Sequence, residues 1–274
     1  MGVVCIQMII FTDLDGTLLN HHTYDYKAVL PILNRLKSLQ IPVILNSSKT
    51  LTELDEWQNK LELNTPMIAE NGGVMRISSN QEPFKKVQLG VSYDHIRSVL
   101  EQIRIEFDWQ FEGFSDWSLA DVMNHTQLHS NQALKAMERE ASEPIIWLDS
   151  DENLSEFKAR LAEHQLTLKQ GGRFYHVMGH HDKATAMKVL LNQFYDVPSS
   201  QVVVALGDSE NDRDMLDYSD YAIVIPNNPA NIFDYPSYFK ITQTAPEGWL
   251  EAIEKILALP TIASPSPLTC QSQR

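Results

Sequence analysis

The stretch from Ile9 to Thr17 reads IIFTDLDGT, and it decides the fold. Its first residues are apolar and β-branched or aromatic, which is typical of a buried strand. Asp13 and Asp15 follow at once, around the turn-forming Gly16. Ligands of open α/β sheets bind at the carboxyl ends of the strands, so both carboxylates are expected to face one crevice. There one carboxylate can attack phosphorus while the other moves a proton. A plain Asp-Gly turn after a buried strand is the alternative interpretation.

Strands and helices alternate in the residues that follow this stretch. The predicted strands are residues 7–12, 42–46, 67–69 and 74–77. The predicted helices are residues 26–39 and 50–63, and the second opens with the capping box Thr50-x-x-Glu53. This βαβαβ order implies a parallel sheet with right-handed crossovers.

From residue 84 to residue 178 the pattern changes to a mixture of helices and strands that is rich in Trp and Phe. Predicted helices are 92–106, 117–124, 132–140 and 153–165, and predicted strands are 109–114, 145–148, 166–169 and 173–178. The alternation of strands and helices then resumes with helix 183–195, strands 201–206 and 221–225, and helix 246–258. We therefore expect an α/β core formed by residues 1–83 and 179–260, an inserted α+β cap formed by residues 84–178, and a disordered tail over 261–274.

Composition limits the possible partners and compartments. The 274 residues are 43% hydrophobic and 21% charged, with a formal net charge of −14. Such an acidic chain is not expected to bind nucleic acid or an anionic membrane. The two cysteines, Cys5 and Cys270, predict no disulfide framework. Neither a signal-peptide pattern nor an apolar run of roughly eighteen residues is present, so we expect a cytoplasmic protein.

Two further segments combine hydroxyl groups or a cation with a helix start. The predicted strand 42–46 runs into Ser47-Ser48-Lys49-Thr50, whose helix N-terminus could bind phosphate, although Ser and Thr also cap ordinary helices. Lys183 lies in the first turn of a predicted helix, where it opposes the helix dipole. A fixed ammonium there could neutralise Asp13, although a solvated surface lysine is the common alternative.

An acidic turn follows another predicted strand. The strand 201–206 ends in Gly-Asp-Ser-Glu-Asn-Asp, residues 207–212. Mg²⁺ favours a few carboxylates together with water and substrate phosphate. We predict a magnesium site that uses Asp13, Asp208, the backbone carbonyl of Asp15, and Asp212 of the same turn. Zinc bound by His21-His22 or His180-His181 is disfavoured, because adjacent histidines rarely direct both rings at one ion.

These four segments resemble, in order and context, the motifs of the haloacid dehalogenase-like hydrolase superfamily. In its sugar phosphatases the second motif usually reads Thr-Gly-Arg, whereas Ser47-Ser48-Lys49 stands here, so an ammonium replaces a bidentate guanidinium. Ser-Ser-Lys-Thr, with AENGG at 69–73, GGRFYH at 171–176 and APEGW at 245–249, is similar to the mannosyl-3-phosphoglycerate phosphatase family over nearly the whole chain except the tail. The resemblance implies a Rossmann-like core with an inserted cap. It also implies hydrolysis of mannosyl-3-phosphoglycerate, or of its glucosyl analogue, to the glycosylglycerate, a compatible solute.

On this interpretation each motif residue has a role. Asp13 attacks phosphorus, and Asp15 protonates the leaving alkoxide and then activates water, while Mg²⁺ and Lys183 neutralise charge. The predicted substrate-binding residues are Ser47, Ser48, Lys49, Glu70, Asn71 and Arg173. Arg173 is the cap residue expected to bind the substrate carboxylate or phosphate, and Lys49 is a second candidate for the carboxylate. His176 is more readily interpreted as a core or edge histidine.

Three alternatives stay open at this point. The motifs recognise only the phosphoryl group, so a phosphatase for another sugar phosphate, such as sucrose phosphate, or a phosphomutase-like transferase fits them equally. A non-catalytic sugar-phosphate sensor fits less well, because a sensor has no need of a nucleophile. The preferred sugar, the oligomeric state and the amplitude of any cap closure do not follow from the sequence.

Overall fold

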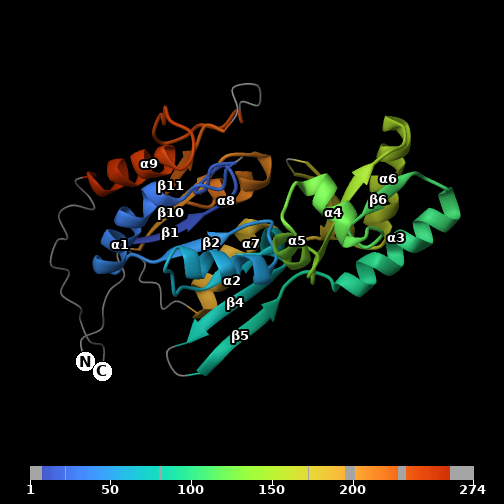
Figure 1. Ribbon diagram of the computed structural model, residues 1–274, viewed down its shortest axis with the longest axis horizontal. Coiled ribbons are helices and arrows are strands. Elements are labelled where there is room, and N and C mark those ends of the chain that lie inside the picture. Colours follow the sequence, from blue (N-terminus) through green and yellow to red (C-terminus); the bar gives the residue numbers. More distant parts are fainter. Residues whose placement is uncertain are drawn as a thin grey trace.

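The computed structural model describes residues 8–21, 23–79, 82–171, 173–194, 201–227 and 233–259. Within these ranges the chain forms a seven-stranded and a four-stranded sheet, which lie in two adjacent bodies (Figure 1). The expected fold class, an α/β core with a mostly parallel sheet and an additional α+β unit, is confirmed. Cys5, Cys270, His22, Gly172 and the predicted tail lie outside the described residues. No described helix has the length and apolar character needed to cross a membrane.

The seven-stranded sheet has the order β11-β10-β1-β2-β3-β4-β5. Its strands are β1 (Met8–Thr12), β2 (Val43–Asn46), β3 (Met67–Ala69), β4 (Val74–Ser79), β5 (Glu82–Gln88), β10 (Val202–Gly207) and β11 (Tyr221–Val224). The strands from β11 to β3 are parallel, and β4 and β5 are antiparallel to their neighbours. Since the chain leaves β1 toward β2 on one side and returns through β10 on the other, the strand order reverses between β1 and β10. This is the position at which ligands bind in such sheets.

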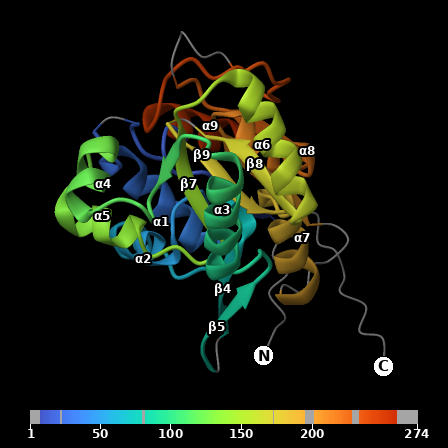
Figure 2. The same ribbon diagram turned by 90° about the vertical axis from the view of Figure 1, so that its right-hand side faces the viewer.

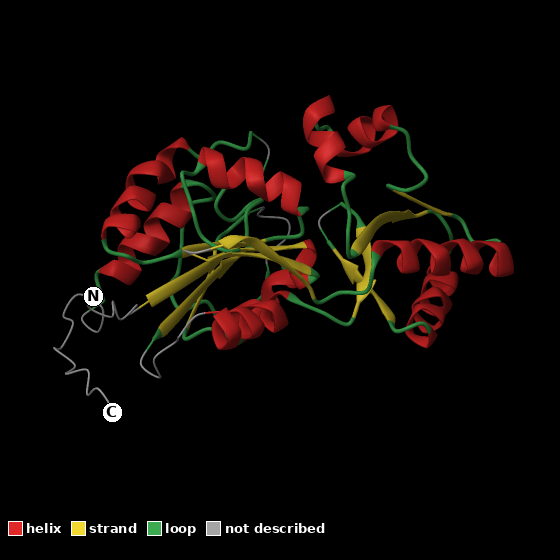
Figure 3. Ribbon diagram, turned by 90° about the horizontal axis from the view of Figure 1, so that it is seen from below, coloured by secondary structure: helices red, strands yellow, loops and turns green. Residues whose placement is uncertain are grey.

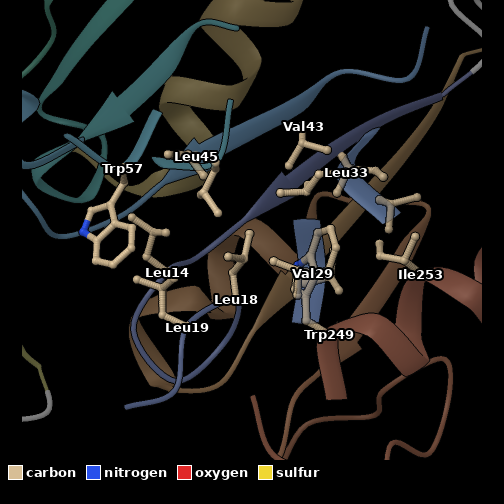
Figure 4. Close-up of a cluster of buried hydrophobic side chains, with 14 of the residues drawn as sticks. Leu14, Leu18, Leu19, Val29, Leu33, Val43, Leu45, Trp57, Trp249 and Ile253 are labelled. Atoms are coloured by element: carbon tan, nitrogen blue, oxygen red, sulfur yellow. The ribbon is translucent and has the colours of Figure 1, made fainter. Parts of the chain in front are cut away.

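Helices cover both faces of this sheet (Figure 3). One face packs against α1 (Leu30–Ser38), α2 (Leu51–Lys60) and α9 (Glu247–Leu257), and the other against α7 (Lys183–Phe194) and α8 (Arg213–Asp217). Strand β1 supplies Met8 and Ile10 to the first face and Ile9 and Phe11 to the second, as the period of two requires. Figure 4 shows the first cluster, in which Trp249 of α9 is fully buried.

The four-stranded sheet has the antiparallel order β6-β7-β9-β8 and carries the residues that we call the cap. Its elements are α3 (Tyr93–Phe107), β6 (Phe111–Gly113), α4 (Leu119–Thr126), α5 (Ser130–Ala136), β7 (Ser142–Trp147), α6 (Asp151–Glu163), β8 (Leu166–Gln170) and β9 (Tyr175–Gly179). Helices α3 and α6 pack on one face, while α4 and α5 form a smaller cluster toward the other side (Figure 2). The division of the chain into domains at the predicted residue numbers stays a prediction.

Two elements differ from the sequence-based expectation. The predicted strands of this part of the core end at residue 77, but β5 pairs with β4 and extends the seven-stranded sheet to Gln88. Its polar side chains suit an edge strand, since residues 85, 86 and 88 are exposed. Helix α5 ends at Ala136 instead of the predicted residue 140, because the backbone from Glu140 onward turns to bind Glu70, as described below.

Candidate active site

Asp13 and Asp208 lie side by side at the ends of adjacent parallel strands. Thr12 of β1 is in register with Leu206 of β10, and the N–H of Asp13 donates to the carbonyl of Leu206 at 3.0 Å. Gly16, with φ +86°, allows the two loops to meet, because a Cβ there would lie 2.7 Å from Asp208 Oδ2. One carboxylate oxygen from each of Asp13, Asp208 and Asp212 lies within 4.8 Å of the other two. The chain thus brings together the ends of its first and fourth motifs.

Lys183 is the cation of this cluster. It opens α7, its side chain is fully buried, and its Nζ lies 2.6 Å from both Asp13 Oδ1 and Asp212 Oδ1. Burial alone would lower the pKa of Lys183, but the two carboxylates outweigh this effect and hold the pKa above its ordinary value. Asp212 Oδ2 accepts the N–H groups of Asp208 at 2.9 Å and Ser209 at 3.2 Å. Asp212 therefore uses both of its oxygens to order the cluster.

Asp13, Asp208 and Asp212 together carry more negative charge than Lys183 balances. Burial raises the pKa of Asp13 to about 7. Lys183 opposes this rise with the second-largest effect, and the negative charge of Asp212 adds to it. Burial and the neighbouring carboxylates also raise the pKa of Asp208. Asp208 accepts hydrogen bonds from Thr17 Oγ1 at 2.8 Å and from Asn227 Nδ2 at 2.7 Å. These hard oxygen donors and the surplus negative charge suit a divalent cation, which Asp13 and Asp208 could hold.

Asp15 takes part in a second ion pair beside this cluster. Its Oδ2 lies 2.8 Å from Lys49 Nζ, and Glu53 Oε1 lies 3.6 Å from the same ammonium. Lys49 is 8% exposed and also lies over the ring of Tyr24, 5.4 Å from its centroid. The predicted capping box forms between Thr50 and Glu53 and fixes the start of α2. The side chain of Asp15 is thus directed to Lys49, and metal binding through its backbone carbonyl stays a prediction.

The two predicted serines occupy different positions. Ser47 is 1% exposed, its N–H donates to Ile68, and its carbonyl accepts the N–H of Asn71 at 3.0 Å. Ser48 lines the cavity described below, and its carbonyl accepts Arg139 Nη1 at 2.9 Å. Of the two residues, Ser48 is therefore the one placed to meet a ligand in this structure.

The buried side chain of Trp249 is hydrogen-bonded to the end of β1. Trp249 Nε1 donates to Thr12 Oγ1 at 3.0 Å, and this hydroxyl donates to the carbonyl of Asp13 at 2.7 Å. The side chain of Trp249 is fully buried among the residues shown in Figure 4. Segment 245–249, which carried part of the family resemblance, thus holds the backbone at Asp13.

Glu70 lies where the cap joins the core, and it does not line the cavity. It is fully buried, and its carboxylate accepts the N–H of Glu140 at 2.8 Å, the N–H of Ala141 at 3.0 Å and the hydroxyl of Ser142 at 2.7 Å. Its neighbour Asn71 accepts a hydrogen bond from Asn211 Nδ2 at 3.3 Å. Both residues have positive φ, +50° and +55°, which the surrounding contacts must maintain. Their role in substrate binding stays a prediction. In this structure Glu70 joins the cap to the core, whereas Asn71 is hydrogen-bonded to Asn211 and Ser47 within the core.

We expect Glu70→Gln to lower the free energy of unfolding by about 2–3 kcal/mol. An amide can accept at one atom only, so its NH₂ group would face a buried donor of the cap. Urea unfolding followed by circular dichroism measures the change. Glu106→Gln on the exposed side of α3 is the control and should change stability by less than about 0.5 kcal/mol. Equal unfolding midpoints for the two variants would contradict this role of Glu70.

A cavity of about 720 Å³ lies between the carboxylates and the cap. The core lines it with acidic groups that include Asp13, Asp15 and Asp208, and with Lys49 and Arg213. The cap lines it with Phe114, Thr126, Leu128, Ala136, Arg139, Pro144, Gly171, Arg173, Phe174 and His176. Among the described cap residues that line the cavity, the charged side chains are those of Arg139 and Arg173, and none is a carboxylate. The cap wall is therefore positive and partly aromatic, opposite an acidic floor.

Arg173, the cap residue expected to bind the substrate, lines the cavity, and its binding role stays a prediction. Two further cap residues, which the sequence did not assign to the site, also line it. Arg173 lines the cavity and donates to the carbonyl of Thr126. Arg139 also lines it, donates to the carbonyl of Ala136 at 2.8 Å in addition to Ser48, and lies 5.5 Å from the centre of the Phe114 ring. Arg139 lies within the predicted helix 132–140, whereas α5 ends at Ala136, so no sequence pattern assigned Arg139 to the site. His176 was interpreted as a core or edge residue, yet it lines the same cavity.

His180 and His181 lie outside the candidate cluster of metal ligands among the described residues, and His22 lies outside the described residues. That cluster consists of the three aspartates. His180 is exposed, while His181 is buried with Nε2 at 3.2 Å from the carbonyl of Glu70. Burial lowers the pKa of His181 to about 4, so its ring is neutral. His181 thus belongs to the junction of cap and core.

Comparison with known proteins identifies this arrangement. Solved structures with the same fold include protein 0175 of Thermoplasma acidophilum, which is 19% identical with a TM-score of 0.67, over 92% of this chain and 98% of that one. A haloacid dehalogenase-like hydrolase from B. subtilis is 18% identical with a TM-score of 0.65, over 91% and 99%. BT1666 from Bacteroides thetaiotaomicron, described among the phosphatases of the haloalkanoate (HAD) enzyme superfamily, is 16% identical with a TM-score of 0.66, over 90% and 94%. The haloacid dehalogenase-like hydrolase family itself matches residues 10–253. The chain therefore belongs to the haloacid dehalogenase-like hydrolases.

Proposed function

We propose that this hydrolase is a magnesium-dependent phosphomonoesterase that releases phosphate from mannosyl-3-phosphoglycerate or its glucosyl analogue. The observation that carries the proposal is the contrast between the two walls of the cavity. The floor holds the buried Asp13, Asp208 and Lys183, which suit phosphoryl transfer. The cap presents Arg139 and Arg173, which suit a second anionic group on the leaving side. A phosphorylated hydroxy acid carries both groups.

Lys49 gives independent support for a carboxylate in the substrate. Its ammonium is shared between Asp15 and Glu53, at 2.8 Å and 3.6 Å. A substrate carboxylate that competes for this ammonium would release Asp15 from its ion pair and leave it available for proton transfer. A neutral sugar alcohol offers no such competitor. This is a physical reason for a lysine at a position where related sugar phosphatases usually have arginine.

The chemistry then follows from the residues at the strand ends. Asp13 forms a bond to phosphorus as the bond from phosphorus to the ester oxygen breaks, and the electron pair stays on that oxygen. Asp15, in its carboxylic acid form at the start of this step, gives its proton to this oxygen and becomes a carboxylate. Asp15 next accepts a proton from water, whose oxygen attacks phosphorus and restores the carboxylate of Asp13. Lys183 holds Asp13 in position throughout. A Mg²⁺ ion held by Asp13 and Asp208 supplies charge neutralisation when it is bound.

A substrate panel tests the proposal. Phosphate release is measured with mannosyl- and glucosyl-3-phosphoglycerate, 3-phosphoglycerate, sucrose phosphate and mannose 6-phosphate. We expect kcat/KM for a glycosyl-3-phosphoglycerate to exceed that for the phosphates without a carboxylate by about 100-fold, because two charge-assisted contacts are lost. A preference for sucrose phosphate or mannose 6-phosphate would contradict the proposed substrate. Ligand binding without phosphate release would favour a sensor.

We expect Mg²⁺ to raise Tm more at pH 8 than at pH 5.5. The pKa of Asp13 is about 7 in the folded chain, against an ordinary value of 3.8, so the metal-free fold binds this proton more tightly and loses stability as pH rises from about 4 to 7. Above about pH 7 the carboxyl group of Asp13 is ionised, so Mg²⁺ no longer has to displace a proton from it. At about 100 times Kd, Tm should rise by about 5–10 °C at pH 8 and by less than half as much at pH 5.5. Equal shifts at both pH values would contradict metal binding by Asp13.

A further inference from the structure

His176 occupies the middle of a row of side chains on the cavity side of the cap sheet. Pro144 of β7, His176 of β9 and Lys169 of β8 are in register, so their side chains share one face. Lys169 pairs with Asp214 of the core at 3.0 Å, and proline has no side-chain polar group. Adjacent Val177 packs on the opposite face, among α3 and α6. The imidazole is therefore the polar group that this row directs toward the cavity.

The ring of His176 is buried without satisfying its hydrogen-bonding capacity. The residue is 8% exposed, and Nδ1 is sealed from solvent with no partner among the described residues. Because Nδ1 is enclosed and unpaired, and because buried polar groups of folded proteins are normally paired, Nε2 is the ring atom through which this imidazole can gain a partner from the cavity. The opposite edge of the ring faces Gly171, where a Cβ would lie 2.9 Å from Nε2 and 3.0 Å from Cδ2. Because residue 171 has no side chain, Nε2 can be reached from the cavity.

The surroundings decide what this ring can bind. Burial, and in second place the positive charge of Arg139, lowers the pKa of His176 to about 3, so the imidazole is neutral under physiological conditions. A neutral imidazole offers one donor and one acceptor, which match a hydroxyl group better than they match an anion. The neighbouring wall consists of Phe114, Leu128 and Phe174, which can cover the apolar face of a sugar ring or polyol.

We propose that His176 is a specificity-determining residue whose Nε2 hydrogen-bonds a hydroxyl group of the leaving group. This inference rests on the proposed phosphomonoesterase activity and adds to it the position at which the glycosyl part is recognised. In this arrangement Arg139 and Arg173 hold the acidic part of the leaving group, and His176 distinguishes a glycosylated substrate from the bare phosphoglycerate.

The test compares two substrates that differ only in the glycosyl group, mannosyl-3-phosphoglycerate and 3-phosphoglycerate. His176→Phe keeps the ring shape and removes both nitrogens. We expect kcat/KM to fall about tenfold for the glycosylated substrate, mainly through KM, and to be unchanged for 3-phosphoglycerate. His176→Gln, whose amide reaches the position of Nε2, should recover most of the loss. Gly171→Ala keeps the imidazole but places a methyl group against Nε2, so it should reproduce the loss.

Each outcome decides the question. Equal losses on both substrates, or no loss on either, would overturn the role of His176, and so would a Gln variant as impaired as the Phe variant. If the wild-type protein releases phosphate from neither phosphoglycerate, the proposed substrate fails. The same variants are then compared on glucose 6-phosphate and p-nitrophenyl phosphate, which differ in leaving-group hydroxyls. An unchanged ratio of kcat/KM between those two substrates would also overturn the role of His176.

Discussion

Asp13→Asn is expected to abolish phosphate release, with a fall in kcat of about 10⁴-fold or more, because the amide cannot replace a carboxylate nucleophile. The fold should persist. Burial already raises the pKa of Asp13 to about 7, so removing its charge relieves an unfavourable buried carboxylate and leaves Lys183 paired with Asp212. Tm at pH 8 without metal should therefore be equal to that of the wild type or higher. Steady-state phosphate release and thermal unfolding measure the two effects.

Asp234→Asn provides the matched control for this experiment. Asp234 lines the same cavity and is exposed, but it does not belong to the carboxylate cluster. Its substitution removes one negative charge near the substrate and should change kcat by no more than about threefold. Comparable losses in the two variants would show that the cavity charge, and not the nucleophile at Asp13, accounts for the activity.

The second large effect is expected for Lys183→Met. Methionine fills a similar volume but leaves Asp13, Asp208 and Asp212 without the buried ammonium that lies 2.6 Å from two of them. Breaking a buried ion pair in this way should cost about 3–5 kcal/mol of unfolding free energy in EDTA, and activity should fall with it. The cost should be smaller at pH 5.5, because Asp13, with its raised pKa, is then protonated in the folded chain. Urea unfolding at the two pH values measures this difference.

Lys188→Met on the same helix separates the buried pair from a general effect of removing lysine. Lys188 is exposed and lies over the ring of Tyr218, 4.9 Å from its centroid. Its loss should change stability by less than about 1 kcal/mol and leave activity unaltered. A Lys183 variant that is as stable as the Lys188 variant in EDTA would contradict the electrostatic role of Lys183.

The sequence predicted which carboxylates of the core lie together, because strand-end residues of a parallel sheet meet by topology. Once β1 and β10 are recognised as parallel strands, Asp13 and Asp208 must lie at one edge, and the structure places them there. The capping box at Thr50 and Glu53 is a local pattern of four residues, and it also formed as predicted. The burial of Lys183 agreed with its unusual position at the start of a helix.

The cap and its junction were less predictable, because their contacts join distant residues. Glu70 binds the backbone at residues 140–142, and no periodic pattern signals a carboxylate that accepts bonds from peptide groups so far along the chain. The same contact ended α5 early and brought Arg139 to the cavity. His176 looked like an ordinary strand residue, since its environment depends on the packing of the cap against the core.

The junction around Glu70 has an evolutionary consequence. The chain leaves the seven-stranded sheet after Gln88 and returns to the core at α7, which begins at Lys183, and both crossings lie next to Gly73 and Glu70. No parallel strand is interrupted by this excursion. The intervening segment can therefore be exchanged as a module, while the sheet edge that carries Asp13 and Asp208 stays unaltered. New specificities could arise by grafting at one seam, without redesign of the reacting groups.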